Sequence, residues 1–211
     1  MILVIENEVD LEYRYLVDEI TDYLPGSRVY DYVQGEGGHP KLTDVDGVII
    51  GGSTAGVYET DKYGWIEDEK ALIRQLAERD IPTLGICFGH QIVNSAFGGE
   101  VINTGNRKSY LVNAEFTDDP LLRDVKPVVP VLHSDRVTRK GEGMEVIGES
   151  GYYDNFATKH QDAPVWSVQF HPEFTKRVEH KGDGWTRNHL SFDESNSPKT
   201  IKNFAELSEN Y

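Results

Sequence analysis

The chain has 211 residues, of which 38% are hydrophobic and 10% aromatic, enough for one domain with a full apolar core. Its 36 acidic and 21 basic residues give a formal net charge of -15, which repels nucleic-acid phosphates and excludes a DNA- or RNA-binding role. No apolar run approaches the roughly 20 residues of a membrane span, and the single cysteine, Cys87, excludes an internal disulfide and a cysteine-rich zinc site.

The acidic residues are spread along the chain and do not form a tail-like block. This distribution suits a surface adapted to high salt, where repulsion between like charges is screened. An ordinary acidic cytoplasmic enzyme is the alternative. The segment Met1–Glu6 lacks a basic region and a small-residue cleavage site, so we expect a first strand, not a signal peptide, and a cytoplasmic protein.

Apolar patterns and chain-breaking residues predict alternating strands and helices in the first eighty residues. Residues 1–6 are apolar on both faces, as a sheet covered by helices requires. A helix is expected over 10–24, with Leu11, Leu16 and Ile20 on one face. The next expected elements are a strand over 27–33, a loop over 34–43, a strand over 45–50, a glycine loop over 51–56, a connector over 58–64 and a helix over 65–79.

The next segment predicts a short buried strand, a sharp turn at Cys87 and a helix that ends at Gly98-Gly99. Gly85 and Gly89 flank the cysteine at minus two and plus two, the nucleophile-elbow pattern with Cys in place of Ser. Such a turn lifts the sulfur clear of the sheet and sets it at a helix N-terminus, which favours the thiolate. The alternative is a small buried hydrophobe, the usual state of a free cysteine.

The second half of the chain predicts short strands with little helix. They cover 110–116, 128–133, 145–149, 156–160 and 165–170, with a brief helical turn over 120–125. Together the two halves predict an α/β fold: a mostly parallel, flavodoxin-like open sheet with helices on both faces and a partly antiparallel C-terminal extension. No repeat or linker divides the chain, so residues 1–211 are expected to form a single domain.

The strand over 165–170 leads directly into His171, Pro172 and Glu173. A thiolate nucleophile needs a base, and the base needs a group that orients it. Glu173 is close enough in sequence to hold one imidazole nitrogen while the other faces the sulfur. Cys87, His171 and Glu173 are therefore the candidate catalytic residues.

These motifs in combination resemble the class I (triad-type) glutamine amidotransferases. The resemblance covers about residues 1–174 and rests on the Gly51-Gly52 pair, the segment from Gly85 to Gln91, the segment 98–101 and the segment from Gln169 to Glu173. Within the family, the segments 85–91 and 133–135 and the strand into 169–173 are most similar to the separate glutaminase subunits of archaeal GMP synthetases.

The resemblance assigns further roles. Backbone N–H groups of Gly52 and Phe88 would form the oxyanion hole, the usual device of acyl-transfer enzymes. Gln91, Ser134 and Asp135 match positions that contact bound glutamine. The family usually has proline after the second glycine of the oxyanion loop, where this chain has Ser53. The glycine-rich run also suggests a flexible loop that a partner sets.

The implied reaction is hydrolysis of L-glutamine to glutamate and ammonia, without a metal or cofactor on this chain. Ammonia needs a consumer, and the sequence contains no ATP-binding synthetase module. The resemblance therefore implies a separate ATP-pyrophosphatase subunit, which would use ATP and magnesium to aminate XMP to GMP. Two alternatives stay open. The first is a glutamine amidotransferase that serves a different synthetase, or a free-standing hydrolase of γ-glutamyl compounds. The second is a non-catalytic module that binds glutamine and regulates a partner.

Three other segments carry weaker predictions. His133, Ser134 and Asp135 are expected at a strand end, where a capped turn is the structural alternative to a site. The polar stretch over 176–196 is expected to be an exposed loop or flap, in which His180 and His189 are weak metal-ligand candidates. A final helix over 198–208, opened by a Ser197 cap and a first-turn proline, is expected to pack Ile201, Phe204, Ala205 and Leu207 on the sheet.

Overall fold

The computed structural model describes residues 1–35, 38–178 and 185–211 as an α/β fold built on one nine-stranded sheet, in the order β2-β1-β3-β4-β9-β8-β7-β5-β6. The elements are β1 (Ile2–Glu6), α1 (Tyr15–Thr21), β2 (Arg28–Asp31), β3 (Gly47–Ile50), α2 (Trp65–Glu78), β4 (Thr83–Ile86), α3 (Phe88–Ala96), β5 (Glu100–Phe116), η1 (Pro120–Leu122), β6 (Val128–Arg139), β7 (Met144–Ser150), β8 (Tyr153–His160), β9 (Val165–Val168), η2 (Phe192–Glu194) and α4 (Lys199–Ser208).

The parallel core of the sheet contains β2, β1, β3, β4 and β9. The residues of β3, β4 and β9 are buried throughout, because helices cover both faces. Side chains of α1 and α4 pack on the face that carries Val4 and Ile49, whereas α2 and α3 pack on the face that carries Leu3 and Ile50. The predicted parallel sheet with helices on both faces is confirmed.

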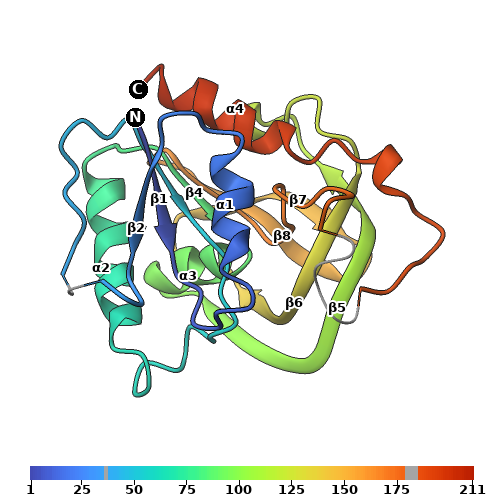
Figure 1. Cartoon of the computed structure of the whole chain (residues 1–211), viewed down its shortest axis with the longest axis horizontal. Helices are drawn as coiled ribbons and strands as arrows, with labels where there is room; N and C mark the ends of the chain where they lie inside the picture. Colours follow the sequence, from blue (N-terminus) through green and yellow to red (C-terminus); the bar gives the residue numbers. More distant parts are fainter. Residues whose placement is uncertain (36–37, 179–184) are drawn as a thin grey trace.

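The rest of the sheet is antiparallel and contains β8, β7, β5 and β6. In Figure 1, α2 lies at one end of the molecule and the long strands β5 and β6 at the other. These two strands have 17 and 12 residues, so the shorter spans expected over 110–116 and 128–133 were wrong at one end of each. Their extra residues are mostly polar and partly exposed, which removes the apolar signal although pairing continues.

Helix α1 begins five residues later than expected. Residues 11–14 form turns, in which the carboxylates of Glu8 and Asp10 accept hydrogen bonds from the N–H groups of Asp10 and Glu12, at 2.8 and 3.0 Å. Such side-chain-to-backbone bonds compete with the helical ladder. As a result Leu11 is 72% exposed, whereas the helical pattern placed it on the buried face.

Helix α4 lies where it was predicted, and Ile201 and Phe204 are fully buried against the sheet. The expected Ser197 cap was wrong, because no side chain caps the helix. The Ser197 hydroxyl instead donates to the carbonyl oxygens of Pro172 and Phe174, at 3.3 and 3.5 Å, beside the end of the candidate triad. The C-terminal helix is thereby tied to the chain around Glu173.

The stretch over 176–196 is only partly an exposed loop. Val178 is buried, and Trp185 stacks on Phe192 at 5.4 Å between ring centroids. His189 is exposed, and His180 lies outside the described residues. In the part of the chain that the structure describes, no group of three His, Cys, Asp or Glu side chains is arranged to hold a metal ion, and no helix is long and apolar enough to cross a bilayer.

Candidate active site

Cys87 occupies the sharp turn between β4 and α3, with φ 56° and ψ -103°. A non-glycine residue reaches this conformation only where its surroundings enforce it. A Cβ atom on Gly85 would lie 2.3 Å from the Gly89 carbonyl oxygen, and one on Gly89 would lie 2.2 Å from the Ile50 carbonyl oxygen. Both glycines are required because backbone fills the space on each side, as the elbow pattern predicted.

His171 follows β9, and its backbone N–H donates to the Pro130 carbonyl at 2.9 Å. Its Nδ1 lies 2.7 Å from Oε1 of Glu173, and both side chains are buried. The Cys87 Sγ and the His171 Nε2 both lie within hydrogen-bond distance of the Leu132 carbonyl oxygen, at 3.4 and 3.3 Å. The three predicted catalytic side chains are therefore brought together, with sulfur and imidazole beside one carbonyl.

The protonation state of His171 depends on its two neighbours. Burial alone would lower its pKa, but the charges and hydrogen bonds of Cys87 and Glu173 outweigh burial and raise the pKa well above its ordinary value. Phe174 stacks on the imidazole at 4.3 Å between ring centroids and limits its rotation. The imidazolium form of His171 is therefore favoured by its neighbours, and the ring is fixed in orientation beside the sulfur.

The glycine loop over 51–56 forms a further side of the site, next to Cys87 and His171. A Cβ atom on Gly52 would lie 3.5 Å from Cε1 of His171 and 3.9 Å from Cβ of Cys87, so this residue lies against both candidate catalytic side chains. The Gly51 carbonyl accepts a hydrogen bond from the Gly89 N–H at 3.2 Å. That bond fixes the Gly51–Gly52 peptide plane and, with it, the direction of the Gly52 N–H.

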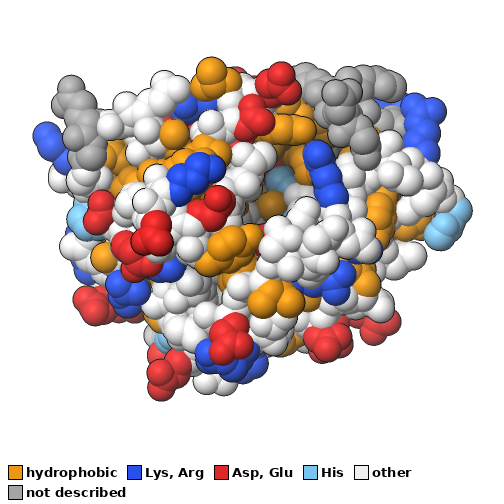
Figure 2. All heavy atoms as spheres, turned by 90° about the horizontal axis from the view of Figure 1, so that it is seen from below, with side chains coloured by type: hydrophobic (Ala, Val, Ile, Leu, Met, Phe, Trp, Pro, Cys, Tyr) orange, Lys and Arg blue, Asp and Glu red, His pale blue; other side chains and the backbone are white. Residues whose placement is uncertain are grey.

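A cavity of about 420 Å³ opens above Cys87. Figure 2, which views the molecule from below relative to Figure 1, shows a hollow with a histidine side chain at its floor and charged side chains of both signs around it. The cavity walls come from three regions: the glycine loop with Tyr58 and Glu59, the β1–α1 segment with Glu8 and Tyr13, and the β5–β6 hairpin with Asn103, Arg107 and residues 132–135. Its walls therefore offer a guanidinium and several carboxylates together.

The three predicted substrate-binding residues all line this cavity. Gln91 is buried, so the alternative of an exposed polar position on α3 was wrong; its Nε2 donates to the Asp135 carbonyl and to Oε1 of Gln169, at 3.4 and 3.3 Å. Ser134 and Asp135 lie within β6, so a strand end or capped turn at this point was also wrong. Asn103 donates to Oδ1 of Asp135 at 2.7 Å, which orients that carboxylate.

Sequence reasoning missed several residues of the cavity, among them Glu8, Asn103, Arg107 and Leu132. Glu8 follows the carboxyl end of a parallel strand, which is where α/β sheets place their sites, so its position carried a usable signal. Arg107 lies in the polar part of β5, and Leu132 contributes a backbone carbonyl; neither has a signature in a single sequence.

The family model for glutamine amidotransferase class-I matches residues 28–187, and the chain belongs to this family of enzymes. The resemblance predicted from the motifs is thereby confirmed. Over 145 residues the protein is 33% identical to one subunit of the glutamine-hydrolyzing GMP synthase of Methanothermobacter thermautotrophicus. That alignment covers 67% of this chain and 70% of the relative.

Other relatives agree with this assignment. The corresponding GMP synthase subunit of Archaeoglobus fulgidus is 35% identical over 137 residues, covering 63% of this chain and 69% of that one. The chain spans only 29% of the longer glutamine-hydrolyzing GMP synthase of Sulfurimonas denitrificans, to which it is 30% identical over 70% of its own length. Among solved structures, a glutamine amidotransferase of Thermotoga maritima has the same fold, with a TM-score of 0.77, 20% identity and coverage of 100% and 98%.

Proposed function

We propose that this chain hydrolyses the side-chain amide of L-glutamine. The observation that carries the proposal is the placement of the Cys87 sulfur and the His171 Nε2 on one carbonyl oxygen, with Glu173 on the far imidazole nitrogen. This is the geometry of a nucleophile, a general acid–base and an orienting carboxylate, set at the floor of a cavity that a small amino acid can enter.

In the first half-reaction, the Cys87 thiolate attacks the amide carbon. The N–H groups of Gly52 and Phe88 stabilise the tetrahedral oxyanion, and the imidazolium of His171 protonates the leaving ammonia. A γ-glutamyl thioester results. The neutral His171 then takes a proton from water, the hydroxide attacks the thioester, and glutamate leaves as the thiolate and imidazolium re-form. Glutamine and water thus give glutamate and ammonia.

The charges of the cavity match the two ends of a zwitterionic amino acid. The presence of Arg107 in the cavity lining supports a role in binding the α-carboxylate, because a guanidinium fork fits a carboxylate. Asp135, with Glu59 nearby in the lining, supplies negative charge for the α-ammonium group. Burial raises the pKa of Asp135. A bound ammonium would favour its ionised form and thereby gain binding energy.

We infer the acceptor from the relatives whose names make them subunits of a glutamine-hydrolyzing GMP synthase. A subunit of such an enzyme implies a separate partner that consumes the ammonia. The partner proposed here is an ATP-pyrophosphatase subunit, which would use ATP and magnesium to convert XMP to GMP.

The test is ammonia release from glutamine by the wild type and by Cys87→Ala, with and without the synthetase partner, ATP, magnesium and XMP. We expect turnover that requires Cys87, is stimulated by the partner and yields GMP. Turnover that requires Cys87 but ignores the partner would retain the glutaminase chemistry and contradict the GMP assignment in favour of another synthetase or a free-standing γ-glutamyl hydrolase. Glutamine binding without turnover in any mixture would contradict the enzyme proposal and favour a binding module.

A further inference from the structure

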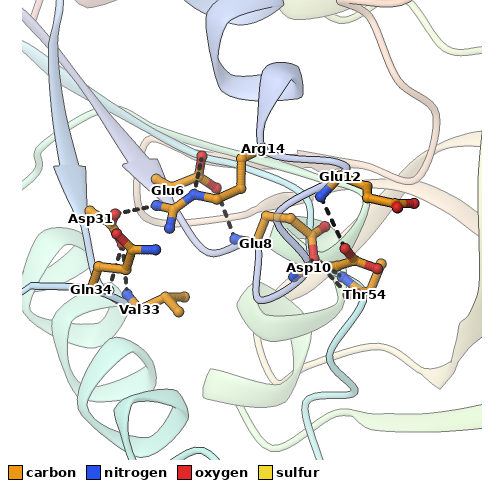
Figure 3. A network of polar contacts seen from close by, with 9 residues as sticks. All are labelled: Glu6, Glu8, Asp10, Glu12, Arg14, Asp31, Val33, Gln34 and Thr54. Carbon is orange, nitrogen blue, oxygen red and sulfur yellow. Dashed lines mark hydrogen bonds and ion pairs between the residues drawn. The ribbon is translucent and has the colours of Figure 1, made fainter. Parts of the chain in front are cut away.

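We propose that Glu8 is a positioning residue for the oxyanion hole, which acts by holding the glycine loop through Thr54. Figure 3 shows the Glu8 carboxylate turned toward Thr54. Its Oε1 accepts the backbone N–H of Thr54 at 3.1 Å and the Thr54 hydroxyl at 2.6 Å. Glu8 is 46 positions away in sequence and 3% exposed, so a buried group from another part of the chain grips the loop two residues past Gly52.

The loop is held on both sides of Gly52. On the near side, the Gly51 carbonyl accepts from the Gly89 N–H, which ties the loop to the nucleophile helix. On the far side, Glu8 holds Thr54. Further hydrogen bonds of the loop join the Gly51 N–H to the Ile5 carbonyl at 3.1 Å, the Ala55 N–H to Ser53 Oγ at 3.0 Å and the Gly56 N–H to Glu59 Oε2 at 2.8 Å. A glycine-rich loop is thereby fixed without the proline that its family usually carries.

Glu8 is itself held in place by its surroundings. Its backbone N–H donates to Oε1 of Glu6 at 2.8 Å, and its own Oε1 also accepts the Asp10 N–H at 2.8 Å. Arg14 forms ion pairs with Glu6 and with Asp31, which attaches this segment to β2. The Glu8 carboxylate is therefore fixed in position, and its hydrogen bonds fix Thr54 in turn.

Catalysis requires that the loop be held in this way, because a hydrogen-bond donor of the oxyanion hole contributes fully only when it already points at the position of the developing charge. Burial raises the pKa of Glu8, against the opposing effect of its hydrogen bonds. Oε1 of Glu8 acts as a hydrogen-bond acceptor, and the oxygen of a neutral carboxamide can accept the same bonds. Glutamine at position 8 should therefore support the loop, whereas alanine should not.

This inference rests on the proposed glutaminase activity. The test compares glutamine hydrolysis by Glu8→Ala, Glu8→Gln and Thr54→Val with that of the wild type, and Glu12→Ala serves as control because Glu12 is an exposed carboxylate of the same segment. We expect Glu8→Ala to lower kcat by about 10- to 100-fold, less than the loss of a whole oxyanion donor. Thr54→Val keeps one of the two bonds and should lose less, and Glu8→Gln should recover at least about half of the wild-type kcat.

Two readouts separate positioning from other roles. The rate of Cys87 alkylation by iodoacetamide should stay within about twofold of wild type, since displacement of iodide forms no oxyanion, whereas a damaged fold or triad would change it. The KM for glutamine should change by less than about threefold. A raised KM that Glu8→Gln fails to restore would overturn the inference, because it would make Glu8 a substrate-binding carboxylate.

The remaining outcomes are also decisive. An unchanged kcat in Glu8→Ala, with an active wild type, would overturn the inference alone. Parallel loss of turnover and alkylation would do the same, because the role would then be structural. A wild type that binds glutamine but never hydrolyses it would overturn the proposed function, and this inference with it.

Discussion

Two segments beside Cys87, called here the elbow wall and the loop wall, are built in different ways. The elbow wall, residues 81–99, contains no Asp, Glu, Lys or Arg, and its turn is packed tightly by backbone, at Gly85 against Gly89 and at Gly89 against Ile50. The loop wall, residues 51–56 with the segment 6–14 behind it, is fixed by side-chain hydrogen bonds across 46 positions. The turn at the candidate nucleophile is thus held by close backbone packing, and the loop that carries the candidate oxyanion donor by hydrogen bonds to side chains.

The largest expected effect comes from a substitution of Glu173, the residue that contacts the imidazole of His171. Glu173→Gln keeps the size of the side chain but removes the charge that helps to raise the pKa of His171. We expect kcat for glutamine to fall roughly 10²- to 10⁴-fold, the range of general acid–base catalysis. The measurement is ammonia release with Glu115→Gln as control, because Glu115 is exposed on β5. A loss of less than about tenfold would contradict the assigned role of Glu173.

The same substitution at one glycine of each wall tests the difference directly. Gly85→Ala places a Cβ atom 2.3 Å from backbone oxygen, whereas Gly52→Ala places one at 3.5 Å from its nearest neighbour, an ordinary contact. We expect urea unfolding to show a loss of about 1–3 kcal/mol or more for Gly85→Ala, as for overpacked cores, and less than about 1 kcal/mol for Gly52→Ala. Equal losses in the free energy of unfolding would mean that Gly52 is packed as tightly as Gly85, and would contradict the difference between the two walls.

This difference explains what the sequence could predict. The spacing of Gly85, Cys87 and Gly89 is a local steric requirement, and the adjacent His171 and Glu173 share one short segment, so both were visible in the chain. The hydrogen bonds from Thr54 to Glu8 join segments 46 positions apart, and no local pattern in the sequence predicts them. The polar turns from Glu8 to Glu12 also delay the start of α1, so one short segment accounts for a missed site residue and a wrong helix boundary.

Polar residues inside β5 and β6 caused the errors at these two strands. Ser134 and Asp135 were expected where a strand ends, because apolar alternation fades after His133. Pairing with β5 continues there as a ladder that places Asp135 opposite Asn103. Those residues line the cavity and bond to each other, so their polarity reflects the site and not a turn.

The two walls should respond to pH with opposite signs. Burial raises the pKa of Glu6 to about 7, so the folded state holds a proton that the unfolded state has lost, and this contribution to stability disappears as pH rises from about 4.5 to about 7. Burial lowers the pKa of His90 in the elbow wall to about 3, so its unfolded form takes up a proton first and stability falls as pH drops below about 6.5.

The Glu6 contribution can be isolated with Glu6→Gln, which keeps an acceptor for the Glu8 N–H. The melting temperature of the wild type should fall relative to that of the variant as pH rises from 5 to 8. Thermal scans at several pH values measure this difference. A difference that is constant with pH, or that changes in the opposite direction, would contradict a raised pKa at Glu6.

The smallest expected effect is that of salt on the acidic surface. With a net charge of -15, and four carboxylates among residues 6–14 against none in the elbow wall, like-charge repulsion should weaken the loop wall more. Raising KCl from low to molar concentration should raise the melting temperature, and hydrogen exchange should show greater added protection in residues 6–14 than in 81–99. A flat or falling melting temperature would contradict adaptation to high salt, whereas equal protection of both segments would place the repulsion elsewhere on the surface.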